Sequence, residues 1–136
     1  MAACGLMIVD DDPVIRGVLR ELVEMCLEGF AVVAEAADGR EAVALAARLD
    51  PDVIVMDIRM PVMDGIQATR RIKHELGLRA VVITATSFGR DEIQEAAFEA
   101  GAAFHVQKPF DLEELTRVLR ESRAVAQGTL RRALRA

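Results

Sequence analysis

The sequence predicts an α/β fold: a doubly wound, five-stranded parallel sheet with helices on both faces. Short apolar runs of strand length alternate with helical patterns along the chain, in the order βαβαβαβαβα. The expected strands are apolar on both faces, which is typical of parallel strands buried between two helical layers. Right-handed crossovers and a length of 136 residues then favour the strand order 2-1-3-4-5 of flavodoxin-like folds.

Each expected strand is an apolar run bounded by acids, glycine or proline. The five runs are residues 4–9, 30–36, 51–56, 80–85 and 103–107. The helix after the first run is predicted to begin at Asp12, a favourable N-cap, with Pro13 in its first turn. The helix after the fourth run is predicted to end at Gly101, and the last helix to begin near Leu112.

Composition limits the domain organisation and the classes of partner. One domain is expected over residues 1–124, followed by an Arg-rich helical extension or linker over residues 125–136. A net charge of −5 without a basic stripe in the main body argues against nucleic-acid binding. The N-terminus lacks the pattern of a signal peptide and no apolar run could span a bilayer, so we expect a cytoplasmic protein with reduced cysteines.

Polar side chains end or follow four of the five predicted strands. They are Asp10, Asp11 and Asp12 after the first strand, Asp57 at the end of the third, Thr84 at the end of the fourth and Lys108 after the fifth. The carboxyl ends of parallel strands lie at one edge of the sheet, where open α/β folds bind ligands beside the first and third strands. We therefore expect Asp57 to point into this crevice and not into the core.

Carboxylates gathered at this edge raise one another's pKa unless a cation lies among them. A few carboxylates with room for water favour Mg²⁺, which often shares its ligands with a phosphate. A lysine and a hydroxyl on the far side would bind the other phosphate oxygens. The set predicts an aspartyl phosphorylation site with Asp57 as nucleophile. Asp12 is assigned only the N-cap, and each other residue taken singly is also typical of a loop, strand end or turn.

Four segments carry a resemblance to a known family. They are MIVDDDPVIR, VIVMDIRMPVMDG, VVITATS and AGAAFHVQKPFDLEEL. Together they resemble the receiver domain of two-component response regulators, the chemotaxis-regulator-like fold, over residues 4 to about 122. The resemblance implies that Asp57 accepts a phosphoryl group from a histidine kinase or a histidine phosphotransfer protein. It also implies that Asp10, Asp11 and Asp57, with the backbone carbonyl of Arg59, hold Mg²⁺.

The resemblance also assigns roles around the phosphate. Thr84 would bind the phosphate after moving toward it, and Lys108 would form an ion pair with the phosphate. The peptide bond between Lys108 and Pro109 is expected to be cis. Thr84 and His105 would form the conformational switch, although the family usually has an aromatic residue at the position of His105. Arg59 and Thr86 would tune the lifetime of the phosphate. Around His105 the sequence is most similar to the single-domain regulator of the sporulation phosphorelay.

The output is expected to be protein binding through the surface of the fourth helix, fifth strand and fifth helix. No helix-turn-helix follows, so this chain is not expected to bind DNA directly, and as a phosphoacceptor it is not expected to be an enzyme. Two alternatives stay open: a receiver fragment of a longer transcriptional regulator, and a relay intermediate that passes its phosphate to a histidine phosphotransfer protein. A haloacid-dehalogenase-type phosphatase would need an acid where Arg59 stands, and a flavodoxin would need a phosphate-binding loop in place of the three aspartates.

Overall fold

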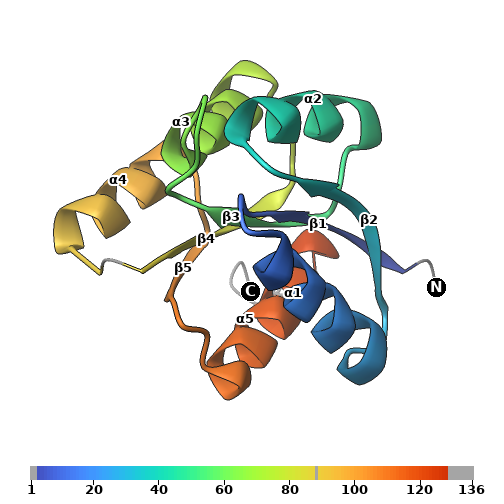
Figure 1. The fold of residues 1–136 in the computed structure, drawn as a ribbon. Coiled ribbons are helices and arrows are strands. Elements are labelled where there is room, and N and C mark those ends of the chain that lie inside the picture. The colour runs from blue at the N-terminus through green and yellow to red at the C-terminus, as the bar shows by residue number, and fades with distance from the viewer. Residues whose placement is uncertain (1–2, 88, 129–136) are drawn as a thin grey trace, which may run out of the picture.

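A five-stranded parallel sheet runs through the middle of the molecule, between two layers of helices (Figure 1). The computed structural model describes residues 3–87 and 89–128. The strands are β1 (Cys4–Val9), β2 (Phe30–Ala36), β3 (Val53–Asp57), β4 (Val81–Thr86) and β5 (Phe104–Gln107). The helices are α1 (Pro13–Cys26), α2 (Gly39–Leu49), α3 (Gly65–Arg70), a π-helical turn η1 (Arg71–Glu75), α4 (Asp91–Ala100) and α5 (Leu112–Ala126). The strand order is β2-β1-β3-β4-β5, which confirms the predicted fold.

The two faces of the sheet bury different sets of side chains because successive strand residues point to opposite faces. On one face, Leu6 and Val55 pack with Leu19 of α1 and Leu115 of α5. On the other face, the strands pack against α2, α3 and α4, largely through small residues such as Ala46, Ala68 and Ala97. The central strands β1, β3 and β4 are buried on both faces, as their continuous apolar runs predict.

Side-chain caps fix the starts of α1 and α3, and a glycine fixes the end of α4. The side chain of Asp12 accepts a hydrogen bond from the backbone N–H of Val14, so Asp12 is the predicted N-cap of α1. Asp64 and Gln67 form a reciprocal capping box at the start of α3. Gly101 ends α4 with φ 114°, a left-handed conformation that glycine adopts without strain.

The fourth strand is shifted by one residue toward the C-terminus from its predicted bounds. We expected it to end at residue 85 with Thr84 at its tip, but β4 continues to Thr86 and pairs with β5 as far as Gln107. Thr84 therefore lies inside the strand, opposite Met56, and it is Ala85 that pairs with Asp57. The apolar run alone gave no sign that Thr86, a β-branched residue that suits a strand, would extend it.

Most of the predicted Arg-rich extension, residues 129–136, lies outside the described residues. Helix α5 ends at Ala126. Among the helices of residues 3–87 and 89–128, none combines the length and the apolar character that a membrane crossing requires.

Gly65 supports the tip of β3 by close backbone approach, and Gly65→Ala should destabilise the fold by roughly 2–4 kcal/mol. A Cβ at this position would overlap the carbonyl oxygen of Asp57 and crowd the backbone of Ile58. Urea unfolding of the two proteins measures the difference. Gly17→Ala is the matched control: a Cβ there meets nothing within 4 Å, and alanine should stabilise α1 by about 0.5–1 kcal/mol. Equal effects at the two positions would contradict the packing argument.

Candidate functional site

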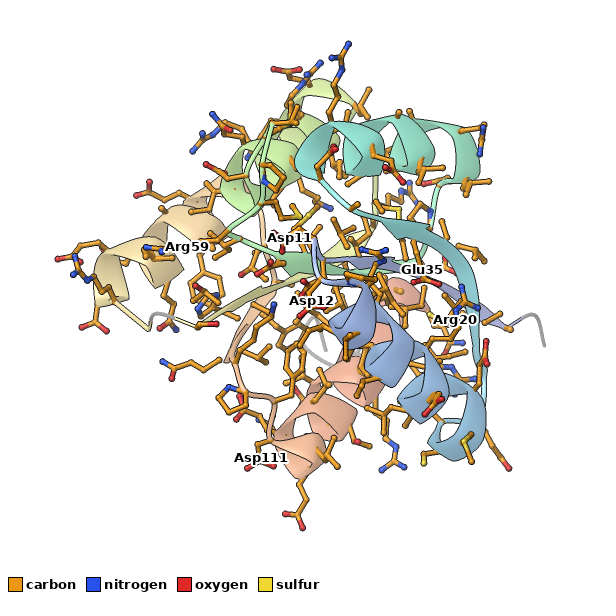
Figure 2. The ribbon with its side chains drawn as sticks, in the orientation of Figure 1. Asp11, Asp12, Arg20, Glu35, Arg59 and Asp111 are labelled. Carbon is orange, nitrogen blue, oxygen red and sulfur yellow. The ribbon has the colours of Figure 1, made fainter. Side chains whose placement is uncertain are left out.

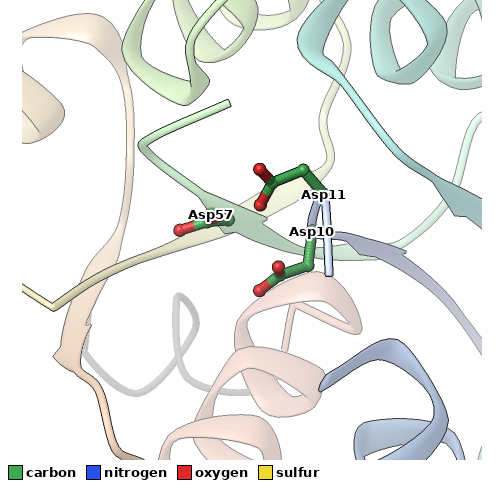
Figure 3. Close-up of side chains that lie close together, drawn as sticks. All are labelled: Asp10, Asp11 and Asp57. Atoms are coloured by element: carbon green, nitrogen blue, oxygen red, sulfur yellow. The ribbon is translucent and has the colours of Figure 1, made fainter. Parts of the chain in front are cut away.

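Three aspartates meet at the carboxyl edge of the sheet, from the ends of β1 and β3 (Figure 3). One carboxylate oxygen from each of Asp10, Asp11 and Asp57 lies within 4.8 Å of the other two. Asp10 and Asp57 are only 2% and 6% exposed, whereas Asp11 is exposed to solvent. The prediction that these residues come together at this edge is confirmed by the geometry of the cluster.

The backbone around Asp57 is fixed by hydrogen bonds from the neighbouring strand and loop. The N–H of Ile58 donates to the carbonyl oxygen of Ala85 at 2.9 Å, which continues the β3–β4 pairing past Asp57. The N–H of Gly65 donates to the carbonyl oxygen of Ile58 at 2.8 Å, which closes the loop after β3. Asp57 is thus presented on a backbone with little freedom to shift.

Lys108 provides the positive charge of the cluster. Its Nζ lies 2.5 Å from Oδ2 of Asp10 and 3.3 Å from Oδ1 of Asp57. Burial lowers the pKa of Lys108, but the hydrogen bond to Asp10 and the charge of Asp57 outweigh burial and leave it above its usual value. Lys108 is therefore a fixed cation. Its peptide bond to Pro109 is cis, as expected.

Asp57 has a perturbed pKa, which is raised from 3.8 to about 6. Burial is the main cause, followed by the negative charge of Asp10, and Lys108 offsets only part of both. Three carboxylates thus face one ammonium group, which leaves an excess of two negative charges when all are ionised. This donor set suits a hard divalent cation such as Mg²⁺, whose preferred ligands are carboxylate and carbonyl oxygens and water.

The cluster opens into a hollow of about 600 Å³. It is lined by Asp10, Asp11, Asp12, Ile15, Asp57, Arg59, Ser87, Lys108 and Pro109. Asp11 and Arg59, from the loops after β1 and β3, lie at the same edge of the sheet (Figure 2). Of the predicted site residues, Thr84, Thr86 and His105 are not among those that line the hollow. Ser87 lines it and was missed, because the predicted end of the fourth strand fell one residue too early.

Thr84 and His105 form a pair behind the hollow. They are register partners on β4 and β5, and Oγ1 of Thr84 lies 2.8 Å from Nδ1 of His105. Thr84 is fully buried, and burial lowers the pKa of His105. Nε2 of His105 is also buried and has no hydrogen-bond partner among the described residues. The two expected switch residues are therefore in direct contact, on the side of the site nearest the outer strand.

Comparisons with known proteins agree with this arrangement. A model of the response regulator receiver domain matches residues 6–120. The chain is 43% identical over 105 residues to chemotaxis protein CheY of Halobacterium salinarum, covering 77% of this chain and 84% of CheY. It is 44% identical over 125 residues to protein-glutamate methylesterase/protein-glutamine glutaminase 3 of Hahella chejuensis, covering 85% of this chain. The chain spans only 35% of that protein's length.

Solved structures show the same fold. A two-component response regulator of the LuxR family from Aurantimonas sp. SI85-9A1 superposes with a TM-score of 0.82 and 38% identity, covering 93% of this chain and 87% of that one. The CheX–CheY–BeF3–Mg complex of Borrelia burgdorferi gives a TM-score of 0.82 and 29% identity, covering 88% of this chain and 89% of that one.

The fold and the acidic edge define the class of phosphorylatable α/β signalling domains. The chain belongs to the response regulator receiver domain family. It is a receiver domain of the two-component type, and membership implies phosphorylation on an aspartate. Receiver domains interact with histidine kinases and with downstream effectors.

Replacing Asp57 with asparagine should stabilise the metal-free protein, and the gain should grow with pH. An acid whose pKa is raised in the folded state, here to about 6, costs stability once the pH exceeds its unfolded-state value of 3.8. The gain should be near zero below about pH 4, rise between about pH 4 and 6, and reach on the order of 2–3 kcal/mol above that. Urea unfolding in EDTA across this pH range measures it.

Asp12→Asn is the control for this experiment. It removes one negative charge from the lining of the same hollow, while asparagine preserves the helix cap. Asp12 is exposed, so we expect a change below about 0.5 kcal/mol. Similar gains in both variants would show that general charge repulsion, and not the burial of Asp57, sets the effect.

Proposed function

We propose that Asp57 is the phosphoacceptor and that the chain accepts its phosphoryl group from a phosphohistidine of a kinase or phosphotransfer protein. The observation that carries the proposal is the buried Asp57 carboxylate at the head of an open hollow, between two other aspartates and a lysine. Its oxygen attacks phosphorus, the P–N bond breaks, and the donor imidazole leaves with the electron pair. An acyl phosphate forms on Asp57.

We assign Mg²⁺ binding to the carboxylates of Asp10, Asp11 and Asp57 with the backbone carbonyl of Arg59. The excess negative charge of the cluster supports this assignment. When bound, the ion neutralises the carboxylates and the phosphoryl oxygens as they come together. The Borrelia CheY complex, which contains BeF3 and Mg, supports the same kind of site here.

Lys108 and the end of β4 complete the environment of the phosphoryl group. The ammonium of Lys108 already contacts Asp57, so it can pair with the new phosphate without a large movement. Thr84 would reach the phosphate only by leaving His105. We assign the phosphate-binding hydroxyl to Thr84, which directly precedes Ala85, the register partner of Asp57. Its movement toward the phosphate would break the contact with His105 and so connect the site to β5.

The proposed output is a change in protein binding through the surface of α4, β5 and α5. The Thr84–His105 contact supports this, because it connects β4, next to the site, with the strand that forms part of that surface. The chain acts as a phosphoacceptor and not as an enzyme on other substrates, in the cytoplasm. Onward transfer to a histidine phosphotransfer protein, or control of an effector domain in a longer regulator, remain the two alternative outputs.

Incubation with acetyl phosphate and Mg²⁺ should add one phosphoryl group to the wild type and none to Asp57→Asn. Asparagine is nearly isosteric but lacks the nucleophilic carboxylate. Intact-protein mass spectrometry measures the addition, and EDTA should abolish it. Asp12→Asn should be phosphorylated like the wild type, because Asp12 is committed to capping α1.

The same assay distinguishes the two candidate hydroxyls. Thr84→Val should slow uptake at least threefold more than Thr86→Val, because Thr84 is the hydroxyl proposed to reach the phosphate by leaving His105. Modification of Asp57→Asn, or no uptake by the wild type where another receiver reacts, would contradict the proposed phosphoacceptor.

The phosphorylated form should be long-lived, with a half-life of minutes or more, and Arg59→Ala should shorten it several-fold. Arg59 lines the hollow two residues after Asp57, where its long side chain limits the approach of water to the acyl phosphate. Thr86, the second expected tuning residue, carries no carboxylate or amide that could orient an attacking water. Loss of phosphate after donor removal, followed by intact mass, gives the half-life. Arg40→Ala, an exposed arginine on α2, is the control, and a wild-type half-life of seconds would contradict the prediction.

A further inference from the structure

Every polar group of Asp10 is held by a contact from a different part of the chain. Its N–H donates to the carbonyl oxygen of Ala36 on β2 at 3.1 Å. Its carboxylate accepts from the N–H of Asp12 at 2.9 Å and pairs with Lys108. Its carbonyl oxygen accepts a hydrogen bond from a guanidinium N–H of Arg16 at 2.6 Å. Only this last contact comes from a side chain outside the lining of the hollow.

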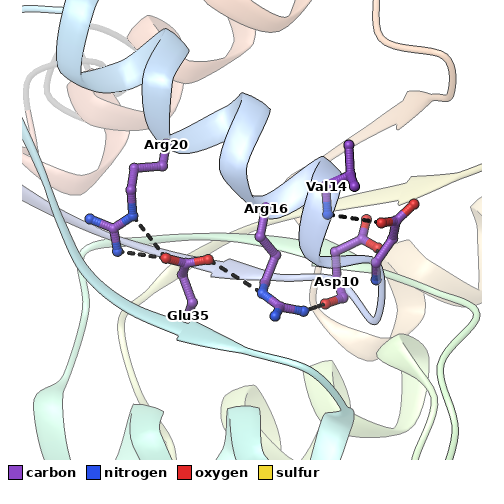
Figure 4. Close-up of polar contacts among 6 residues, drawn as sticks. Asp10, Val14, Arg16, Arg20 and Glu35 are labelled. Carbon is purple, nitrogen blue, oxygen red and sulfur yellow. Dashed lines mark hydrogen bonds and ion pairs between the residues drawn. The ribbon is translucent and has the colours of Figure 1, made fainter.

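Arg16 is itself held in place by β2 (Figure 4). Its Nε lies 3.3 Å from Oε1 of Glu35, and the other carboxylate oxygen of Glu35 lies 2.7 Å from Arg20. Glu35 directly precedes Ala36, the residue that accepts the N–H of Asp10. Two consecutive residues of β2 therefore hold the backbone of Asp10. Ala36 binds its N–H directly, and Glu35 positions Arg16, which binds its carbonyl oxygen.

The carbonyl held by Arg16 belongs to the peptide group that joins Asp10 to Asp11. Because a peptide group is planar, fixing its oxygen also fixes the direction in which the chain continues to the Cα of Asp11. Asp11 is exposed, and none of the contacts described above comes from its own side chain. Arg16 is thus placed to orient the exposed member of the acidic cluster, through the backbone and without touching its carboxylate.

We propose that Arg16, held by Glu35, is a positioning residue that orients the Asp10–Asp11 peptide group and thereby the carboxylates of the metal site. The inference rests on the proposed function, since it assigns Mg²⁺ to these aspartates. The planar fork of arginine suits the role, because one guanidinium group reaches the Asp10 carbonyl and the Glu35 carboxylate together. A lysine keeps the charge but lacks the fork.

The test compares Mg²⁺ affinity in four variants, measured by titration calorimetry with Mg²⁺ alone. Arg16→Met should weaken binding about tenfold, and Arg16→Lys and Glu35→Gln about threefold. Arg20→Met is the matched control. Arg20 lies on the same helix as Arg16 and pairs with the same glutamate, Glu35, at shorter distances, but it makes no contact with Asp10. Arg20→Met should leave the affinity within about twofold of the wild type.

A second readout in metal-free protein separates this inference from the proposed function. The carbonyl ¹³C shift of Asp10 and the amide exchange of Asp11 and Asp12, measured by NMR, should change in Arg16→Met and stay as in the wild type in Arg20→Met. Equal changes in the two variants, or wild-type behaviour of Arg16→Met or Arg16→Lys in both measurements, would overturn the positioning role. If the wild type itself bound no Mg²⁺, the metal assignment would fail, and the metal-free spectra would still decide whether Arg16 orients this peptide group.

Discussion

The main constraint on this structure is the repulsion between the carboxylates that the parallel sheet brings to one edge. β1 and β3 are neighbours with parallel directions, so the acids at their carboxyl ends meet whatever their separation along the chain. Lys108, which is partly buried, balances only part of this charge. Burial, and after it the charge of Asp10, raises the pKa of Asp57. The remaining negative charge suits a divalent cation and chemistry that brings a cation and a phosphoryl group together.

The fold resists this repulsion through backbone contacts more than through the acidic side chains themselves. The backbone at the tip of β3 is tied to β4 through Ala85 and to the start of α3 through Gly65. The backbone of Asp10 is tied to β2 directly and through Arg16. Like charges can be held close only where the chain carrying them cannot relax, and here neighbouring strands and the loop after β3 supply that rigidity.

Behind the charged edge lies a contact that links the site to the outer strand. Thr84 is buried and directly precedes Ala85, the register partner of Asp57, and its own register partner is the half-buried His105 on the outer strand β5. Within the described part of the chain Nε2 of His105 has no hydrogen-bond partner, so the imidazole can change its position without breaking a hydrogen bond at that atom. This is the physical basis for placing the proposed switch here.

The sequence by itself determined the strand order, the helix cap at Asp12 and the edge at which Asp10, Asp11, Asp57 and Lys108 meet, because apolar periodicity and chain order govern these features. It placed the end of β4 too early and so missed Ser87, since no apolar signal marks where pairing with β5 stops. Only the tertiary structure revealed the contact of Arg16 with Glu35 and the Asp10 carbonyl. Such a contact joins a helix, a strand and a backbone oxygen, and no residue spacing along the chain encodes which of many surface charges will meet in space.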